Sequence, residues 1–293
     1  MLGKFIAFFI LFVAIVIGYN IYMETTKNTP KPKITKIKKE SKEKKITKPS
    51  ATIPISKVKN KIKDILEKNS TKNTKKIKTK KPKKVVKVSK ILALTESLSE
   101  RLSTLNANSG DPIFIRIFKK ERTLEVWIKP PKSKIYKLLK IYKICNYSGH
   151  LGPKLKEGDK QAPEGFYKVY KNSLNPNSSY HLSFNLGYPN KYDRVHHRTG
   201  SYLMVHGNCV SVGCYAMGNK NIEDIYSLVE DALDNGQHFV NVHIFPFKME
   251  HLQEYKRYKW YNFWRNLKEG YDKFNKTKKP PKISVRHKRY IIN

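Results

Sequence analysis

A long lysine-rich segment near the N-terminus limits how much of this sequence is able to form a folded core. Residues 24–90 contain 25 Lys and 5 acidic residues, an excess of 20 positive charges. The segment is also rich in Thr and Pro and contains no aromatic residue. Such a composition cannot bury enough apolar surface to offset the conformational entropy lost on folding. We therefore expect a disordered linker over residues 24–88, followed by the folded part of the protein.

An apolar run precedes the linker. Residues 5–22 are almost uniformly apolar, and 18 helical residues span roughly 27 Å, close to the thickness of a membrane's hydrocarbon layer. No convincing small-x-small cleavage site lies near Gly18 or Asn20, so we expect an uncleaved transmembrane anchor over residues 1–23. More lysines follow the run than precede it, and the positive-inside rule alone would place the rest of the protein in the cytoplasm.

The net charge of +37 restricts the classes of partner. A basic excess attracts nucleic acid, an anionic membrane surface or an anionic cell wall. The aromatic residues lie mostly in the C-terminal half, where they follow the periodicity of folded elements, and a bias toward Lys, Ile and Asn runs through the whole sequence. We therefore expect no nucleic-acid partner, and we regard contact of the linker with anionic wall or lipid as the alternative use of its charge.

Apolar periodicity predicts the folded elements. A helix is expected over residues 89–108, because leucines recur on one face, and a domain is expected over residues 109–248. Its expected strands are residues 113–118, 123–128, 135–144, 165–170, 202–205 and 239–244. A helix is expected over residues 221–235, and residues 249–293 are expected to form a helical extension packed on the domain. The fold class is mainly β with a few helices.

One nine-residue stretch carries the clearest chemical signal. It runs His206-Gly207-Asn208-Cys209-Val210-Ser211-Val212-Gly213-Cys214 and directly follows an apolar run. A thiol nucleophile needs a base for its proton, and a preceding glycine lets the backbone approach a substrate carbonyl. His206 and Cys214 are therefore the candidate base and nucleophile.

Other interpretations of these residues exist. Cysteines are often buried for structural reasons. A zinc site of His206, Cys209, Cys214 and His243 is a second possibility, but the spacing matches no common zinc pattern, and we expect no metal and no cofactor. Three cysteines are too few for a disulfide framework. Cys209 is expected either to be buried or to pair with Cys214 under oxidation.

Further candidates surround this pair. Ser211 can hydrogen-bond His206, the oxyanion or its own turn. Arg198 is a candidate clamp for a substrate carboxylate, because its planar guanidinium matches that group. Residues 180–189 mix hydrogen-bonding and aromatic side chains, as a peptide-binding cleft would. The candidate substrate-binding residues are Arg198, His181, Asn185, Tyr188 and Gly207.

The stretch from His206 to Met217, of the form His-Gly-x-Cys-Val-Ser-x-Gly-Cys-x-Ala-Met, resembles the catalytic motif of the L,D-transpeptidase (YkuD-type) family, with its YafK-like branch the nearest likeness. The resemblance extends through residues 148–155, 157–167, 175–181, 243–247 and 263–272. It implies a β-sandwich-like catalytic domain outside the cytoplasmic membrane (in the periplasm) that acts on peptidoglycan stem peptides. It also implies that Cys214 is the nucleophile, that His206 moves the proton, and that amides around Gly213 form the oxyanion hole.

The sequence departs from the family pattern at a position that bears on substrate binding. Many members carry an arginine two residues after the cysteine, where this protein has Ala216. The leading hypothesis is an L,D-transpeptidase that transfers a stem peptide to an amine. One alternative is a hydrolytic relative, an L,D-carboxypeptidase or an amidase that releases wall-linked peptide or protein. The other is a non-enzymatic basic protein that binds the envelope.

Overall fold

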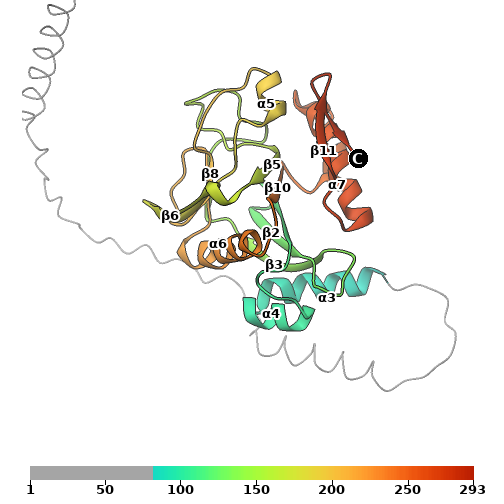
Figure 1. Cartoon of the computed structure of the whole chain (residues 1–293). Coiled ribbons are helices and arrows are strands. Elements are labelled where there is room, and N and C mark those ends of the chain that lie inside the picture. The colour runs from blue at the N-terminus through green and yellow to red at the C-terminus, as the bar shows by residue number, and fades with distance from the viewer. Residues whose placement is uncertain (1–81) are drawn as a thin grey trace, which may run out of the picture. The chain divides into compact units, whose positions relative to one another are not determined.

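The computed structural model describes residues 82–293, shown in colour in Figure 1. The apolar run expected to form a membrane anchor, and nearly all of the lysine-rich linker, lie outside these residues. Within residues 82–293, none of the helices is long and apolar enough to cross a membrane.

Two five-stranded mixed sheets form the framework of the domain (Figure 1). The first sheet contains, in spatial order, β3 (Lys137–Lys143), β2 (Thr123–Ile128), β1 (Ile113–Phe118), β10 (Val240–Phe245) and β5 (Gly165–Val169). The second contains β4 (Asn146–Tyr147), β9 (Tyr215–Ala216), β8 (Met204–His206), β7 (His181–Asn185) and β6 (Leu174–Ser178). The pairs β1–β10 and β8–β9 are parallel, and all other pairs are antiparallel.

The main core joins the two sheets. Alternate residues of the first sheet, such as Ile115 and Val242, share one apolar cluster with Phe184 and Val205 of the second sheet. Helix α6 (Asn219–Asp234) adds its apolar face to the same cluster, including the fully buried Ile225. Each such side chain contributes roughly 1.5–3 kcal/mol by its burial. The predicted fold class, sheet-rich with a few helices, is confirmed.

The other face of the first sheet is aromatic. Strands β1 and β10 place Phe118 and Phe245 on this face, where their rings stack with centroids 5.5 Å apart. Helix α7 (Tyr261–Thr277) and the 3₁₀ helix η2 (Met249–Tyr255) cover it, and the fully buried Trp264 of α7 belongs to this second cluster. The C-terminal extension therefore packs on the domain through its own aromatic layer.

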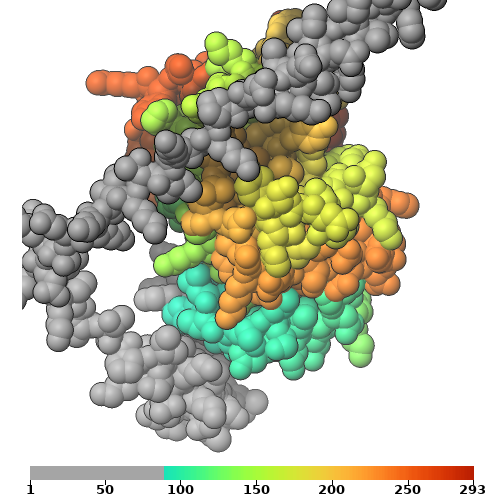
Figure 2. Space-filling model, turned by 90° about the vertical axis from the view of Figure 1, so that its left-hand side faces the viewer, coloured from blue at the N-terminus to red at the C-terminus, as the bar shows by residue number. Residues whose placement is uncertain are grey.

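Two helices replace the single helix expected over residues 89–108. They are α3 (Pro82–Thr95) and α4 (Leu98–Leu105), and Ser97 separates them. The Ser97 hydroxyl accepts from the Glu100 amide, while the Glu100 carboxylate accepts from the Ser97 amide, so a capping box starts a new helix. Figure 2 shows the teal surface of α4 and the end of α3 beside the orange surface that contains α6. The leucine face of α4 packs on the main core.

The last residues of the protein differ from the predicted helical extension. After α7 the backbone forms a hairpin of β11 (Ile283–Arg286) and β12 (Arg289–Ile292). Its two turn residues, His287 and Lys288, have φ of 47° and 56°, the left-handed pair that a tight hairpin turn requires. The alternation of apolar and polar residues around this turn is the signal that a helical interpretation overlooks. The remaining short elements are α5 (Lys191–Val195) and η1 (Lys171–Ser173).

Candidate active site

Strand pairing places Cys214 and His206 on the same face of the second sheet. Strands β8 and β9 are parallel, with Val205 opposite Tyr215, and both of these side chains are buried in the main core. Neighbouring residues of a strand point to opposite faces. Cys214, which precedes Tyr215, and His206, which follows Val205, therefore both point away from the core.

The Cys214 thiol is free and half-buried. The amide of Met204 donates to its Sγ at 3.4 Å, and the thiol donates to the carbonyl oxygen of Tyr202 at 3.6 Å. Burial raises the pKa of the thiol, and this effect outweighs the Met204 amide and the positive charge of Lys154, which favour the thiolate. The thiol is therefore protonated near neutral pH and needs a base to become a nucleophile.

The His206 ring has the properties of such a base. Its Nδ1 lies 2.7 Å from the carbonyl oxygen of Gly207. A carbonyl only accepts hydrogen bonds, so Nδ1 carries the proton and Nε2 keeps the lone pair that can take one. Burial lowers the pKa of the imidazole, so it is neutral at pH 7. The ring of Tyr180 packs over it with centroids 4.7 Å apart and limits its movement.

Two glycines in this segment occupy positions that exclude a side chain. Gly213 has φ of +107°, which strains any other residue. A Cβ on Gly207 would lie 2.4 Å from the carbonyl oxygen of Tyr180, closer than atoms can approach. These constraints shape the backbone on both sides of the loop that connects His206 with Cys214.

Hydrogen bonds hold the turn before the thiol. The Ser211 hydroxyl donates to the carbonyl oxygen of Cys214 at 2.7 Å, so Ser211 closes the turn. The amide of Gly213 donates to the hydroxyl of Ser148 at 2.5 Å. Within the described part of the protein, the amide of Cys214 has no acceptor. It is therefore the amide available to an oxyanion at this turn.

A disulfide joins Cys145 and Cys209, with their Cα atoms 5.4 Å apart. This corrects the expectation for Cys209, which is neither a solitary buried residue nor a partner of Cys214. The bond ties the segment before β4 to the loop that carries the thiol. It also takes Cys209 out of the hypothetical zinc site, while His243 lies among aromatic rings on the first sheet. Residues 82–293 contain no cluster of three or more residues that could hold a metal ion.

Removing this disulfide is expected to lower the free energy of unfolding by about 2–4 kcal/mol, because it closes a loop of 64 residues in the unfolded protein. The measurement is urea denaturation of the double variant Cys145→Ser/Cys209→Ser. Reductant should lower the midpoint of the unaltered protein to that of the variant and should leave the variant unchanged. A variant as stable as the unaltered protein would contradict the expectation.

Two candidate substrate-binding residues lie beside the strand that bears His206. His181 and Asn185 are on β7, which pairs with β8. His181 Nε2 lies 2.8 Å from a carboxylate oxygen of Glu223, at the surface. Asn185 accepts a hydrogen bond from the amide of Gly187. Both remain at the edge of the face that carries the thiol.

A third candidate, Gly207, directly follows His206, but the last two, Arg198 and Tyr188, are not brought into this group. Arg198 is buried, its guanidinium donates to the carboxylate of Asp193 at 2.8 Å, and it packs over the rings of Tyr192 and Phe263. Its guanidinium is therefore not a clamp for a substrate carboxylate. Tyr188 is buried as well, and its hydroxyl donates to the carbonyl oxygen of Lys154. Both residues support loops of the domain.

A buried ion pair missed by sequence reasoning supports the wall of the site. Lys119 and Glu164 are fully buried, with the ammonium 3.1 Å from the carboxylate. The ammonium donates to the carbonyl oxygen of Gly152 at 2.8 Å, and the carboxylate accepts from the amide of Gly152 and from the indole of Trp264. The pair thus anchors the loop that includes Ser148, the partner of the Gly213 amide. A buried Lys–Glu pair 45 positions apart leaves no periodic signal in the sequence.

A second residue missed from the sequence lies beside His206 on the neighbouring strand. Ser183 of β7 is directly opposite His206 of β8. Its hydroxyl is buried and has no hydrogen-bond partner within residues 82–293. The strand register, which only the structure supplies, is what brings this hydroxyl next to His206.

Apolar side chains are exposed around the thiol. Tyr180, Tyr202, Val210 and Val212 are all exposed to solvent. Tyr180 covers His206, the Tyr202 carbonyl contacts the thiol, and the two valines lie on the loop between His206 and Cys214. Exposed apolar groups next to a free thiol mark a surface suited to a ligand.

The domain carries a free thiol and a histidine with a fixed tautomer on the same face of its second sheet. This arrangement is typical of enzymes that transfer acyl groups through a cysteine. The family model described as YkuD, L,D-transpeptidase catalytic domain, matches residues 115–244. The protein is 50% identical over 187 residues to a protein of Escherichia coli strain K12 named "Putative L,D-transpeptidase YafK". The match covers 63% of this chain and 75% of that relative. The chain belongs to the YkuD family of L,D-transpeptidase catalytic domains. This domain implies a cysteine-based enzyme that modifies peptidoglycan.

Two solved structures are more distantly similar. The helical cell shape determining protein Pgp2 from Campylobacter jejuni matches with 19% identity and a TM-score of 0.37, over 65% of this chain and 80% of that chain. Bd1075 from Bdellovibrio bacteriovorus matches with 17% identity and a TM-score of 0.33, over 61% and 78% of the two chains. At these TM-scores we draw no conclusion from either structure.

Proposed function

We propose that this protein is an L,D-transpeptidase that forms an acyl-enzyme on Cys214 with a peptidoglycan stem peptide and transfers the acyl group to an amine. The observation that carries the proposal is the placement of Cys214 and His206 on one face, with the imidazole proton held on Nδ1 by Gly207. Exposed apolar groups around the thiol provide a surface for the peptide.

The chemistry follows from these positions. His206 Nε2 takes the thiol proton while Sγ attacks the carbonyl carbon of the peptide bond. The oxyanion that forms can accept from the amide of Cys214. The C–N bond then breaks, and the imidazolium gives its proton to the leaving amine. In the second half, an acceptor amine attacks the thioester, His206 takes a proton from it, and the thiol is released with that proton.

A hydrolytic reaction uses the same acyl-enzyme with water as acceptor, and one observation favours keeping it as the second candidate. Ala216, at the position where many family members carry an arginine, is fully buried and offers no group to a substrate carboxylate. Incubation of the full-length protein with purified muropeptides, followed by mass spectrometry, separates the two reactions. Cross-linked dimers support transfer, and shortened monomers without dimers support hydrolysis. Neither product from any muropeptide would contradict both.

We also propose that the domain works outside the cytoplasmic membrane, tethered by the apolar run of residues 5–22. Disulfides persist in oxidising compartments and are rare in the cytosol, so the Cys145–Cys209 bond supports a location of the domain outside the cytoplasmic membrane. The positive-inside rule alone would predict the opposite orientation. A reporter active only outside the cytoplasm, fused after Asn293, should be active. A fusion active only in the cytoplasm would contradict this topology.

A non-enzymatic role for the linker is separable from the proposed chemistry. Its excess of lysines suits salt-sensitive contact with an anionic wall or lipid. A variant lacking residues 24–81 is expected to keep its activity on soluble muropeptides while it loses salt-sensitive binding to wall fragments. Loss of activity on soluble substrate would assign the linker a part in catalysis.

The acid limb of the pH–rate profile should lie below the ordinary imidazole value of 6.5, because burial lowers the pKa of His206. The neutral imidazole is the active form, so the rate should be maintained down to pH 6.5 and fall as the pH drops through the lowered pKa. The measurement is kcat/KM against pH for acylation of Cys214. A rate that instead climbs toward pH 9 would show that ionisation of the thiol controls the reaction.

A further inference from the structure

A cavity of about 440 Å³ lies on the aromatic side of the first sheet. The main core separates it from the sheet that carries Cys214. The walls of the cavity come from α3, from strands β1 to β3 and from the end of α7. The residues that matter for its chemistry are Lys90, Arg116, Trp127, Tyr136, Lys248 and Lys278.

Two cations, the buried Arg116 and the partly buried Lys248, share one carboxylate at the base of the cavity. Glu125 accepts from Arg116 Nε at 3.0 Å and Nη2 at 2.7 Å, from Lys248 Nζ, and from the indole of Trp127. Burial opposes the ionisation of Glu125, but the charges of Arg116 and Lys248 outweigh it and hold its pKa at about 2. Two cations against one carboxylate leave one positive charge uncompensated at this wall of the cavity.

Further positive charge lines the same cavity. Within the part of the protein that the structure describes, neither Lys90 nor Lys278 forms an ion pair with an acidic side chain. The Lys278 ammonium lies over the rings of Trp127 and Phe274, and the charge of Glu125 acts on it without a direct contact. Burial lowers the pKa of Lys278, and the nearby Arg116 lowers it further. Glu250 is the one additional acidic residue of the lining, and it already accepts from the hydroxyl of Tyr271. The positive charges that line the cavity therefore outnumber the negative ones.

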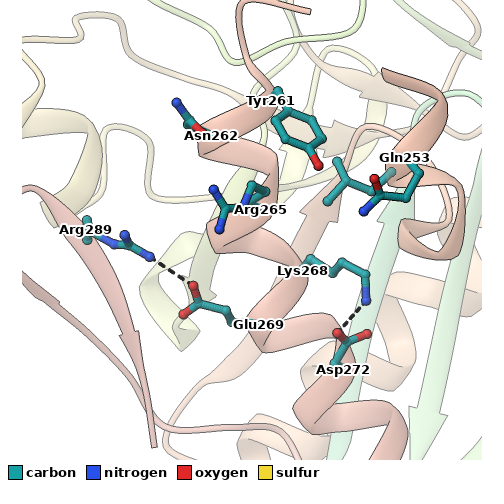
Figure 3. A pocket seen from close by; sticks show the side chains of 9 residues that line it. Gln253, Tyr261, Asn262, Arg265, Lys268, Glu269, Asp272 and Arg289 are labelled. Carbon is teal, nitrogen blue, oxygen red and sulfur yellow. Dashed lines mark hydrogen bonds and ion pairs between the residues drawn. The ribbon is translucent and has the colours of Figure 1, made fainter. Parts of the chain in front are cut away.

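The shallow pocket on α7 shows the contrasting case. There Glu269 pairs with Arg289 and Asp272 pairs with Lys268, so Arg265 is the one cation of that lining left over (Figure 3). The cavity beside Trp127 has a larger excess, with five cationic side chains and two carboxylates in its lining. The N-terminal segment outside the described residues is an unsuitable source of the missing charge, because residues 24–90 carry 25 Lys and 5 acidic residues.

We propose that this cavity binds a small anion, a carboxylate or phosphate group that carries an aromatic or alkyl body. The anionic group lies between the ammonium groups of Lys90 and Lys278, where it supplies the missing charge. The apolar body packs against Trp127 and Tyr136, which line the same space. The site is separate from the proposed acyl transfer and does not depend on it.

The test uses 8-anilinonaphthalene-1-sulfonate, an anion with an aromatic body, titrated into the full-length protein with fluorescence as readout. Saturable one-to-one binding is expected. Lys278→Ala should weaken it by about tenfold or more, because a charge-assisted contact is lost. Lys279→Ala is the matched control, since this neighbouring lysine does not line the cavity. Its affinity should equal that of the unaltered protein.

Two further arms make the outcome decisive. Trp127→Phe should lower the energy transfer from tryptophan to the bound probe more than Trp260→Phe does, because Trp127 lines the cavity and Trp260 does not. Inorganic phosphate should compete weakly, because it supplies the charge without the apolar body. Absence of saturable binding, equal affinity in Lys278→Ala and Lys279→Ala, or equal energy transfer in Trp127→Phe and Trp260→Phe would each overturn the proposal. Thermal unfolding of each variant confirms that it is folded.

Discussion

Replacement of Cys214 by Ala is expected to abolish product formation from muropeptides, with kcat/KM falling roughly 10⁴-fold or more. The reason is that the covalent route requires the thiol as its nucleophile. The measurement is the rate of dimer or shortened-monomer formation by mass spectrometry, together with trapping of the acyl-enzyme by intact-protein mass. The unaltered protein should gain the mass of the acyl donor, and Cys214→Ala should not.

The control for this prediction keeps the thiol and changes its surroundings. Cys145→Ser/Cys209→Ser removes the other two sulfurs, so acylation that persists in it assigns the trapped mass to Cys214. The Cys214 side chain is only half-buried, so its loss should leave the unfolding midpoint nearly unchanged. Equal product formation by Cys214→Ala and the unaltered protein would refute the proposed mechanism, whatever the acceptor.

Replacement of Lys119 by Met is expected to lower the free energy of unfolding by about 3–5 kcal/mol. The substitution leaves the Glu164 carboxylate without its cation in a fully buried position. It also removes the hydrogen bond from the Lys119 ammonium to the carbonyl oxygen of Gly152, which holds the loop around Ser148. The measurement is urea denaturation followed by circular dichroism.

Two variants test this mechanism of destabilisation. Lys120→Met is the matched control, because the neighbouring lysine is exposed and its side chain contacts the hydroxyl and ring of Tyr255. It should leave the urea midpoint nearly unchanged, as substitutions at exposed positions usually do. Lys119→Met/Glu164→Gln removes both charges and should be more stable than Lys119→Met alone. If the double variant is no better, an unpaired buried carboxylate is not the cause.

The larger elements follow closely from sequence patterns. β1 and β2 have the predicted bounds, because their apolar runs end at turn residues. Helix α6 begins two residues earlier than expected, and α7 lies within the helical extension expected over residues 249–293. The strand expected over residues 202–205 is β8, which begins two residues later and ends one residue later than expected, at His206.

The parts that escape sequence analysis depend on contacts between distant segments. Strands β4 and β9 contain two residues each, so they exist only through pairing with each other and with β8. The connectivity of three cysteines depends on which two meet in space, and Cys145 lies 64 positions from Cys209. Arg198 looked like a surface clamp because nothing in its neighbourhood indicates that Asp193 pairs with it in the interior.

The Cys145–Cys209 bond also determines how the protein responds to oxidation of its free thiol. A sulfenic acid on a reactive cysteine is normally resolved by a nearby thiol, which turns it into a disulfide that can be reduced. This sequence has three cysteines, and two of them are already joined. A sulfenic acid on Cys214 therefore has no resolving thiol in the same molecule, and its repair requires a reducing partner from outside before further oxidation makes the loss permanent.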